Sequence, residues 1–184
     1  MASPYLVPVA QLLRNVPSSI EVSFEAPFDE PREFAARGVA ETDVHADAAV
    51  RVELRLQSFS GGLEARGRVE APWHGACRRC SMPVVGRSSV TLHERFVDVR
   101  GPGDDETYLI ENDFADLAPL VHDAIFLDLP LAPLCRDDCR GLCPQCGIDR
   151  NEASCDCRAP GDPRWATLDG LRFTDFMPDE SNEV

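Results

Sequence analysis

The sequence concentrates its cysteines in one short stretch, and these thiols are the residues best suited to chemistry. Six of the eight cysteines lie between Cys135 and Cys157, with the spacing C-x3-C-x3-C-x2-C-x8-C-x-C. The other two, Cys77 and Cys80, form a separate C-x2-C pair. Thiolates are ligands of zinc, and thiols can also be oxidised to disulfides. The stretch therefore predicts either metal binding or disulfide cross-links, and the redox compartment decides between them.

The N-terminal sequence does not predict export. Prolines and Arg14 interrupt the segment where a secretory signal would need an unbroken apolar core. No apolar run approaches the roughly 18 residues that cross a membrane. We therefore expect the protein to remain in the cytoplasm, where thiols stay reduced and lasting disulfides are uncommon. This expectation favours metal binding.

The strongest zinc signal is the pair Cys143 and Cys146, followed by Gly147. A two-residue spacer lets both sulfurs face one ion, and a glycine behind it tolerates the backbone angles of such a turn. The natural partner pair is Cys155 and Cys157. Because a one-residue spacer directs side chains to opposite faces of a strand, that second pair requires a turn.

The four remaining sulfurs are enough for a second zinc site. It would combine Cys77 and Cys80 with Cys135 and Cys139, and so attach the C-terminal part of the chain to the part before it. Ligand pairing cannot be deduced from spacing alone, so other pairings stay open. Four arginines within or beside the cluster would either offset the thiolate charge or simply be surface residues: Arg136, Arg140, Arg150 and Arg158.

Enzyme classes find little support in the sequence. It contains no G-x-S-x-G elbow, no phosphate-binding glycine loop and no H-E-x-x-H motif. A closed four-cysteine site has no open position at which to activate water. A dithiol redox protein is the alternative, but its C-x-x-C motif usually opens a helix, whereas Cys80 is soon followed by Met82-Pro83. We expect a protein without catalytic activity.

The elements that must position the cysteines are mainly strands. In residues 48–58, AAVRVELRLQS, apolar and polar residues alternate with the period of a half-buried strand. Gly61-Gly62 predicts a tight turn, and residues 63–77 and 84–99 would continue as two further strands. This meander places Cys77 and Cys80 at its second turn. Residues 20–24, IEVSF, predict one more strand.

The second half of the chain predicts one clear helix. Its apolar stripe consists of Leu117, Leu120, Val121, Ala124 and Ile125. We expect Asp113 or Asp116 to cap it. Residues 5–16 are expected to form a short helical or irregular segment, residues 28–43 a loop, and residues 164–173 a short helix.

The predicted fold class is α+β, an antiparallel β-meander or sheet with a few short helices and a C-terminal cysteine-rich zinc-binding element. We divide the chain into a β-rich domain (1–100), an acidic linker and helix (101–134), the cysteine-rich zinc element (135–158), and a short helix with an acidic tail (159–184).

Charge is distributed unevenly. Residues 1–100 carry 12 Arg and 13 Asp+Glu, residues 101–184 carry 6 Arg and 19 Asp+Glu, and the chain has no lysine. An acidic field repels phosphate backbones and attracts basic proteins, although it also simply keeps a protein soluble. Within residues 66–100, seven arginines with Trp73, His74 and Phe96 predict either a local RNA-facing patch or the polar face of the meander.

Several segments together resemble the YceD family of large ribosomal RNA subunit accumulation proteins. They are LLRNVPSSIEV, the CRRC motif with Pro83 after it, DLAPLVHDAIFLDLPLAPLC, DCRGLCPQCGIDRNE with CDC, and the tripeptide Asp162-Pro163-Arg164. The resemblance implies a non-catalytic role in synthesis, processing or stability of large-subunit ribosomal RNA. The expected partners are a ribosomal precursor and a basic ribosomal protein or assembly factor at the acidic half, with either ribosomal RNA or another protein at the β portion. A zinc-ribbon adaptor in transcription or another assembly is the alternative.

Overall fold

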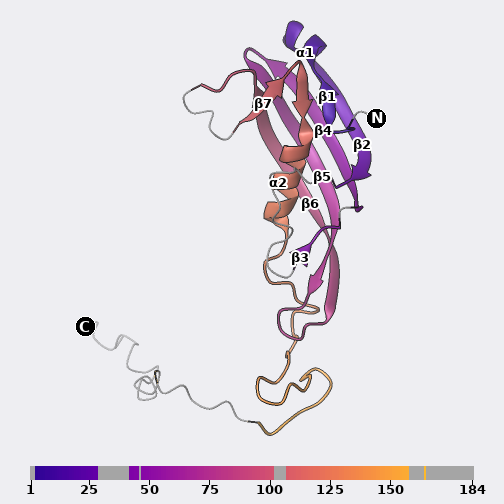
Figure 1. The fold of residues 1–184 in the computed structure, drawn as a ribbon, viewed down its shortest axis with the longest axis vertical. Coiled ribbons are helices and arrows are strands. Elements are labelled where there is room, and N and C mark those ends of the chain that lie inside the picture. Colours follow the sequence, from indigo (N-terminus) through magenta and orange to yellow (C-terminus); the bar gives the residue numbers. More distant parts are fainter. Residues whose placement is uncertain (1–2, 29–41, 46, 102–106, 158–163, 165–184) are drawn as a thin grey trace, which may run out of the picture. The chain divides into compact units, whose positions relative to one another are not determined.

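The computed structural model describes residues 3–28, 42–45, 47–101, 107–157 and 164. The chain divides into two compact units, Met1–Cys139 and Arg140–Val184, and each is described by itself. All labelled helices and strands belong to the first unit (Figure 1). Apart from its first residue, the helix predicted for residues 164–173 lies outside the described residues, as does most of the loop predicted for residues 28–43.

Three long strands form the predicted meander. They are β4 (Ala49–Phe59), β5 (Gly62–Ala76) and β6 (Pro83–Val97), and each pairs antiparallel with the next. The predicted alternation of buried and exposed residues in β4 is confirmed. Its apolar side chains are at most 2% exposed: Val50, Val52, Leu54 and Leu56. The turn between β5 and β6 carries Cys77 and Cys80, which confirms their predicted place.

The meander is part of one eight-stranded sheet (Figure 1). Its path runs β1-β8-β7-β6-β5-β4-β2, and β3 pairs with β5 off this path. The additional strands are β1 (Leu6–Pro8), β2 (Ser19–Pro27), β3 (Thr42–Asp43), β7 (Tyr108–Glu111) and β8 (Phe114–Asp116). The sheet curls, and the Tyr5 hydroxyl near one edge donates to the Pro27 carbonyl at the other, 2.9 Å away.

The prediction of an antiparallel sheet is wrong at one junction, because β7 pairs parallel to β6, with Phe96 opposite Tyr108. Parallel neighbours need a crossover connection rather than a tight turn. Ten residues separate the end of β6 from the start of β7, and they allow the chain to return before it pairs. The sheet is therefore mixed.

The described residues form two helices, α1 (Ala10–Arg14) and α2 (Leu117–Asp128). The Asp116 carboxylate caps α2 by accepting from the Ala118 amide at 2.9 Å, which confirms one of the two predicted caps. Residues 5–16 differ from prediction, since a short strand precedes the helical turn. No helix in the described part is long and apolar enough to span a membrane.

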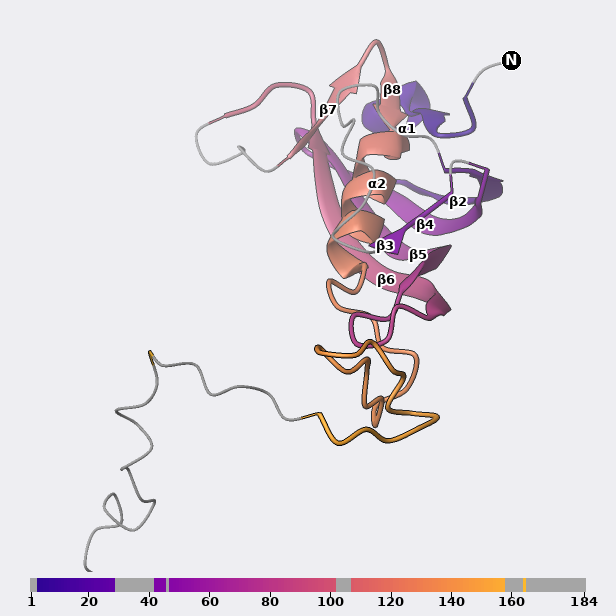
Figure 2. The same cartoon turned by 60° about the horizontal axis from the view of Figure 1, so that its bottom comes forward.

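Helix α2 lies along the inner face of β5 and β6 (Figure 2). Its stripe joins the side chains of the meander in one core, in which Leu117 and Ile125 are fully buried. At the end of the helix, the Ser88 hydroxyl of β6 donates to the Asp128 carboxylate at 2.5 Å. The helix thus leads the following chain directly toward the turn between β5 and β6.

Two aromatic residues of the predicted RNA-facing patch face the interior instead. Phe96 is fully buried, with its ring 5.3 Å from that of Tyr108. Trp73 packs against the core and covers Gly86, where an added Cβ would lie 2.4 Å from the indole ring. Because residues alternate between the two faces of a strand, His74 points to the opposite face.

Candidate metal centres

The first group of four cysteines joins the β5–β6 turn to the segment after α2, within the first unit. Cys77 and Cys80 come from the turn, and Cys135 and Cys139 from the later segment. The sulfurs of Cys77 and Cys139 are 3.8 Å apart, and those of Cys80 and Cys135 are 3.6 Å apart. All four sulfurs lie within 4.8 Å of one another. We call this group the first tetrad.

The spacing of these sulfurs fits one tetrahedral ion. With zinc–sulfur bonds of about 2.3 Å, the edge of a regular tetrahedron is about 3.8 Å. A disulfide would bring two sulfurs to about 2.05 Å. The separations match four thiolates around one metal ion and differ from any cross-link, and all eight cysteines are unbridged.

The turn that carries Cys77 and Cys80 is built around the sulfurs by its backbone. The Cys77 amide donates to the Met82 carbonyl, and the Ser81 amide donates to the Cys77 carbonyl, both at 2.8 Å. Ser81 adopts a left-handed backbone with φ of 60°. This closed turn directs both side chains to one side, as a zinc knuckle requires.

Further hydrogen bonds attach the later segment to this turn. The Arg78 amide donates to the Pro133 carbonyl at 3.0 Å. The Arg79 guanidinium donates to the carbonyls of Cys139, at 2.8 Å, and Asp137, at 3.3 Å. Sequence reasoning missed this positioning role of Arg79, because its acceptors are backbone atoms about sixty residues away that no motif marks.

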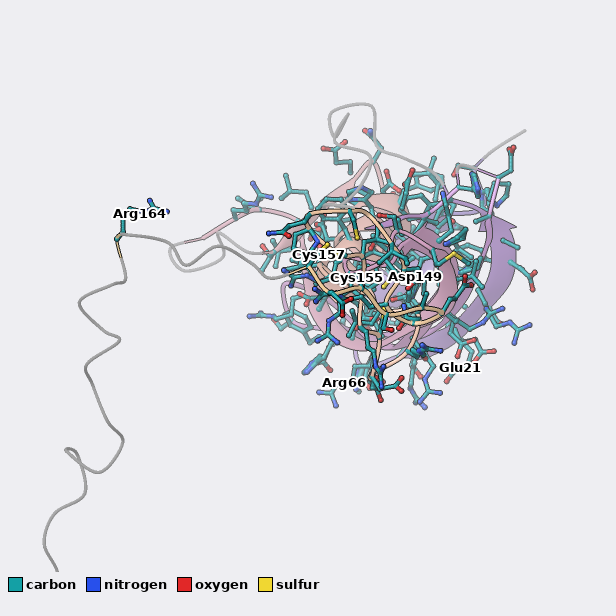
Figure 3. All side chains as sticks on the ribbon, turned by 90° about the horizontal axis from the view of Figure 1, so that it is seen from below. Glu21, Arg66, Asp149, Cys155, Cys157 and Arg164 are labelled. Carbon is teal, nitrogen blue, oxygen red and sulfur yellow. The ribbon has the colours of Figure 1, made fainter. Side chains whose placement is uncertain are left out.

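The second tetrad lies in the second unit and consists of Cys143, Cys146, Cys155 and Cys157. Their sulfurs also lie within 4.8 Å of one another, and Cys155 and Cys157 are labelled in Figure 3. The Cys143 amide donates to the Ile148 carbonyl at 2.8 Å. The structure thus brings the eight cysteines together in the two predicted groups, while metal binding itself stays a prediction.

An asparagine organises the loop of the second tetrad. The Asn151 side-chain oxygen accepts from the Arg140 amide at 2.8 Å, and the Asn151 amide donates to the Asp149 carboxylate at 2.8 Å. The Arg150 amide donates to the Gly141 carbonyl at 2.9 Å. These bonds hold the chain on both sides of the knuckle, and the sequence motif did not reveal them.

The four arginines near the cluster have different roles. The Arg150 guanidinium lies 3.8 Å from the Cys143 sulfur, and this contact raises the pKa of Arg150. Arg136 instead pairs with Asp138 at 3.3 Å. The Arg140 contact uses its backbone amide, and Arg158 lies outside the described residues. The contact of Arg150 with the Cys143 sulfur matches the predicted charge compensation.

Within the first tetrad, the thiols differ in acidity. Burial alone would raise the pKa of Cys77, but the amides of Cys135, Arg79 and Cys80 outweigh it and lower the pKa to about 6. Burial and the neighbouring sulfurs raise the pKa of Cys135 to about 12. Because like charges this close repel, all four sulfurs can ionise together only beside a cation.

The second tetrad repeats the pattern. The amides of Cys146 and Gln145 lower the pKa of Cys143 to about 6. Contact with the Cys146 sulfur, together with burial, raises the pKa of Cys157 to about 12. Each tetrad therefore has one sulfur prepared as a thiolate and one that needs a metal ion to lose its proton. The donor set is that of a divalent metal such as zinc.

Comparison with known proteins identifies the family of this chain. Residues 65–172, a range that includes both tetrads, match the family described as Large ribosomal RNA subunit accumulation protein YceD. The uncharacterized protein Rv2926c of Mycobacterium tuberculosis is 35% identical over 173 residues, which cover 91% of this chain and 81% of that protein. YlbN of Bacillus subtilis, also uncharacterized, is 28% identical over 81% of this chain and 88% of its own length.

A plastid protein is similar over a shorter region. The chloroplastic Large ribosomal RNA subunit accumulation protein YCED homolog 1 of Arabidopsis thaliana is 31% identical over 58 residues, 31% of this chain and 18% of that protein. No solved structure matches the chain. The family match over more than half of the chain, with a relative aligned along most of both lengths, shows that the chain belongs to the YceD family.

Proposed function

We propose that this protein is a non-catalytic factor in the formation of the large ribosomal subunit, where it supports synthesis, processing or stability of the large-subunit ribosomal RNA. The observation that carries the proposal is the family match over residues 65–172. The printed name of the Arabidopsis relative, which concerns accumulation of the same RNA, supports it.

We further propose that each tetrad holds one zinc ion. The ligands would be Cys77, Cys80, Cys135 and Cys139 in the first, and Cys143, Cys146, Cys155 and Cys157 in the second. Four thiolates complete a tetrahedron, so such an ion links segments of chain and leaves no position for a reacting water. Bound zinc supplies the positive charge that the thiolates need. This supports a structural role for the metal and a protein without enzymatic activity.

The charge of the chain suggests which kind of protein it binds. Residues 101–184 carry a net charge of −13 out of −14 for the whole chain. A field of that sign attracts basic surfaces over a distance of about one Debye length, roughly 8 Å at physiological salt. We propose that the acidic half contacts a basic ribosomal protein or assembly factor on a ribosomal precursor.

The test is recovery of partners from cells. The tagged full-length protein is crosslinked in its own host and purified at physiological salt, and the bound RNA and proteins are identified. We expect large-subunit ribosomal RNA precursors or large-subunit proteins to be enriched over small-subunit ones. Recovery of neither would contradict the proposal, and recovery of a transcription complex would support a zinc-ribbon adaptor instead.

A further inference from the structure

An open cavity of about 650 Å³ lies on the first unit, and its lining residues include no cysteine. It is formed by His45 and Ala48, which lie between β3 and β4 in the chain, together with the parts of β5 and β6 that extend past the start of β4. Its lining residues are His45, Ala48, Pro72, Trp73, His74, Val85, Gly86 and Arg87. No carboxylate is among these described lining residues, so none of them repels a phosphate.

The strand register shows which side chains surround this cavity. Pro72 lies opposite Arg87, and His74 lies opposite Val85. These four residues share the face of the sheet that points away from α2, because their neighbour Ala71 is buried in the core and Trp73 packs against it. We call this the outer face. Val85 is 79% exposed there, so the cavity has an apolar surface that solvent reaches.

Two histidines form a flat aromatic platform at the cavity. The rings of His45 and His74 are stacked, with centroids 4.1 Å apart and planes only 8° from parallel. A metal ion bound by two imidazoles would have to lie close to both ring planes, and parallel planes do not meet. The arrangement therefore disfavours a shared metal ion. It offers instead a ring surface on which another planar group can stack.

Arg87 provides a cation beside this platform. On the same outer face, Arg51 pairs with Glu25 and Arg55 with Glu21. For the exposed Arg87 side chain, no ion pair or hydrogen bond occurs within the described ranges of the chain. The nearby Glu70 carboxylate accepts from Ser89 at 3.2 Å. The Arg87 guanidinium is thus available for an anion, and its planar donors suit a phosphate.

We propose that this cavity binds one nucleotide of single-stranded RNA. The base extends the stack of the His45 and His74 rings, beside the apolar surface of Pro72 and Val85, and Arg87 binds the adjoining phosphate. Single-stranded RNA is recognised in this way, by stacking on aromatic rings with cations along the backbone, whereas the bases of a duplex are already stacked on one another. The proposal rests on the proposed function and adds a direct RNA contact to it.

Four variants of the purified full-length protein test the inference. His45→Ala and Arg87→Ala remove the platform and the cation. His93→Ala and Arg55→Ala are matched controls, because they remove the same residue types from the outer face far from the cavity. Binding of a fluorescent ten-nucleotide single-stranded RNA is measured at physiological salt. We expect about 10-fold weaker binding for each of the first two variants and little change for the controls.

Two further measurements separate stacking from general charge. His45→Phe keeps a flat ring, so it should retain binding that His45→Ala loses. In proton NMR, the imidazole resonances of His45 and His74 should shift when the RNA is added, because a stacked base adds its ring current, while those of His93 should not. A duplex of the same sequence should bind at least about 10-fold more weakly than the single strand.

Several outcomes would overturn the inference: no affinity of the wild-type protein for the single strand, equal affinity for the duplex, or equal losses in all four variants. Binding of a ribosomal protein that His45→Ala and Arg87→Ala abolish, without RNA affinity, would also overturn it. If cells still yield large-subunit precursors in that case, the proposed function stands and only the RNA site fails. If cells yield none while the variants behave as expected, the proposed function fails and the RNA site stands.

Discussion

Ser81 and Gly147 occupy the same position in two turns of the same construction. Each follows the second cysteine of a C-x2-C motif, and their φ angles are 60° and 72°. Each donates its amide to the carbonyl of the first cysteine, at 2.8 and 2.9 Å. In both turns the first cysteine's amide donates to the carbonyl five residues later. The two C-x2-C turns therefore have equivalent backbones, although only the second carries the glycine by which the sequence motif is recognised.

The difference between these two residues predicts opposite effects of substitution. A left-handed backbone costs a non-glycine residue about 1 kcal/mol. Ser81→Gly should therefore raise the free energy of unfolding by up to about 1 kcal/mol in thermal unfolding. Gly147→Ala should weaken metal binding roughly five-fold in a chelator competition. An added Cβ at Gly147 meets nothing within 4 Å, so this loss would come from backbone strain alone. Ser81→Ala, which keeps the strain, is the control.

The division of the eight cysteines into two tetrads predicts two metal ions that can be lost separately. Cys77→Ala should remove one equivalent of zinc, loosen the attachment of the β5–β6 turn to the segment after α2, and leave the second ion bound. Cys143→Ala should show the reverse. Metal analysis of the purified variants measures both. Loss of both ions from the Cys77→Ala variant would show that the division into two tetrads is wrong, and a metal-free protein with reversible disulfides would favour the redox alternative.

The depressed thiol pKa values predict release of metal in acid. The pKa of Cys77 and of Cys143 is lowered from an ordinary 9.0 to about 6. Ionisation of these thiols therefore stabilises the fold fully only above the ordinary thiol pKa of 9.0. This stabilisation is lost as the pH falls through the folded-state pKa of about 6. Protons compete with metal for the same sulfurs, so zinc should stay bound at pH 7–8 and be released below about pH 6. Metal content after dialysis between pH 4 and 8 measures this, and full retention at pH 4 would contradict it.

Arg79 should matter more than its neighbour Arg78. Its guanidinium positions the Cys139 backbone through the 2.8 Å hydrogen bond, whereas the Arg78 contact uses the backbone amide, which any residue except proline provides. Residues that orient metal ligands typically change affinity by about 10-fold or more. Arg79→Ala should weaken zinc binding at the first tetrad by that factor, and Arg78→Ala should not. If the two variants weakened zinc binding equally in a chelator titration, Arg79 would have no positioning role.

The contact between Trp73 and Gly86 predicts a severe effect of a single methyl group. An added Cβ at Gly86 would lie 2.4 Å from the indole, and overpacking of this kind costs typically about 1–3 kcal/mol. Gly86→Ala should lower the free energy of unfolding by that amount and change the tryptophan fluorescence. Val85→Ala is the control, because its side chain is exposed. Unchanged stability in Gly86→Ala would mean that the ring moves freely.

Prediction from sequence succeeded where the signal was local and long. The meander, the α2 stripe and the Asp116 cap each follow from several residues with one period or from one spacing. The strands β7 and β8 have four and three residues, too few to display a period of two. Their addition to the sheet, and the parallel pairing of β7, depend on where the chain returns after β6 and not on the propensity of Tyr108–Glu111.

Local sequence is enough to predict the alternating strands, the helix with its cap and the turn around Cys143, because each depends on interactions between residues only a few positions apart. Which sulfurs meet depends on tertiary packing. Cys77 and Cys139 are 62 positions apart, and only the packing of α2 on β5 and β6 brings their sulfurs to 3.8 Å. Tertiary packing also buries Phe96, places Trp73 against the core and stacks His45 on His74, because the face that a strand residue occupies depends on the register of its neighbours.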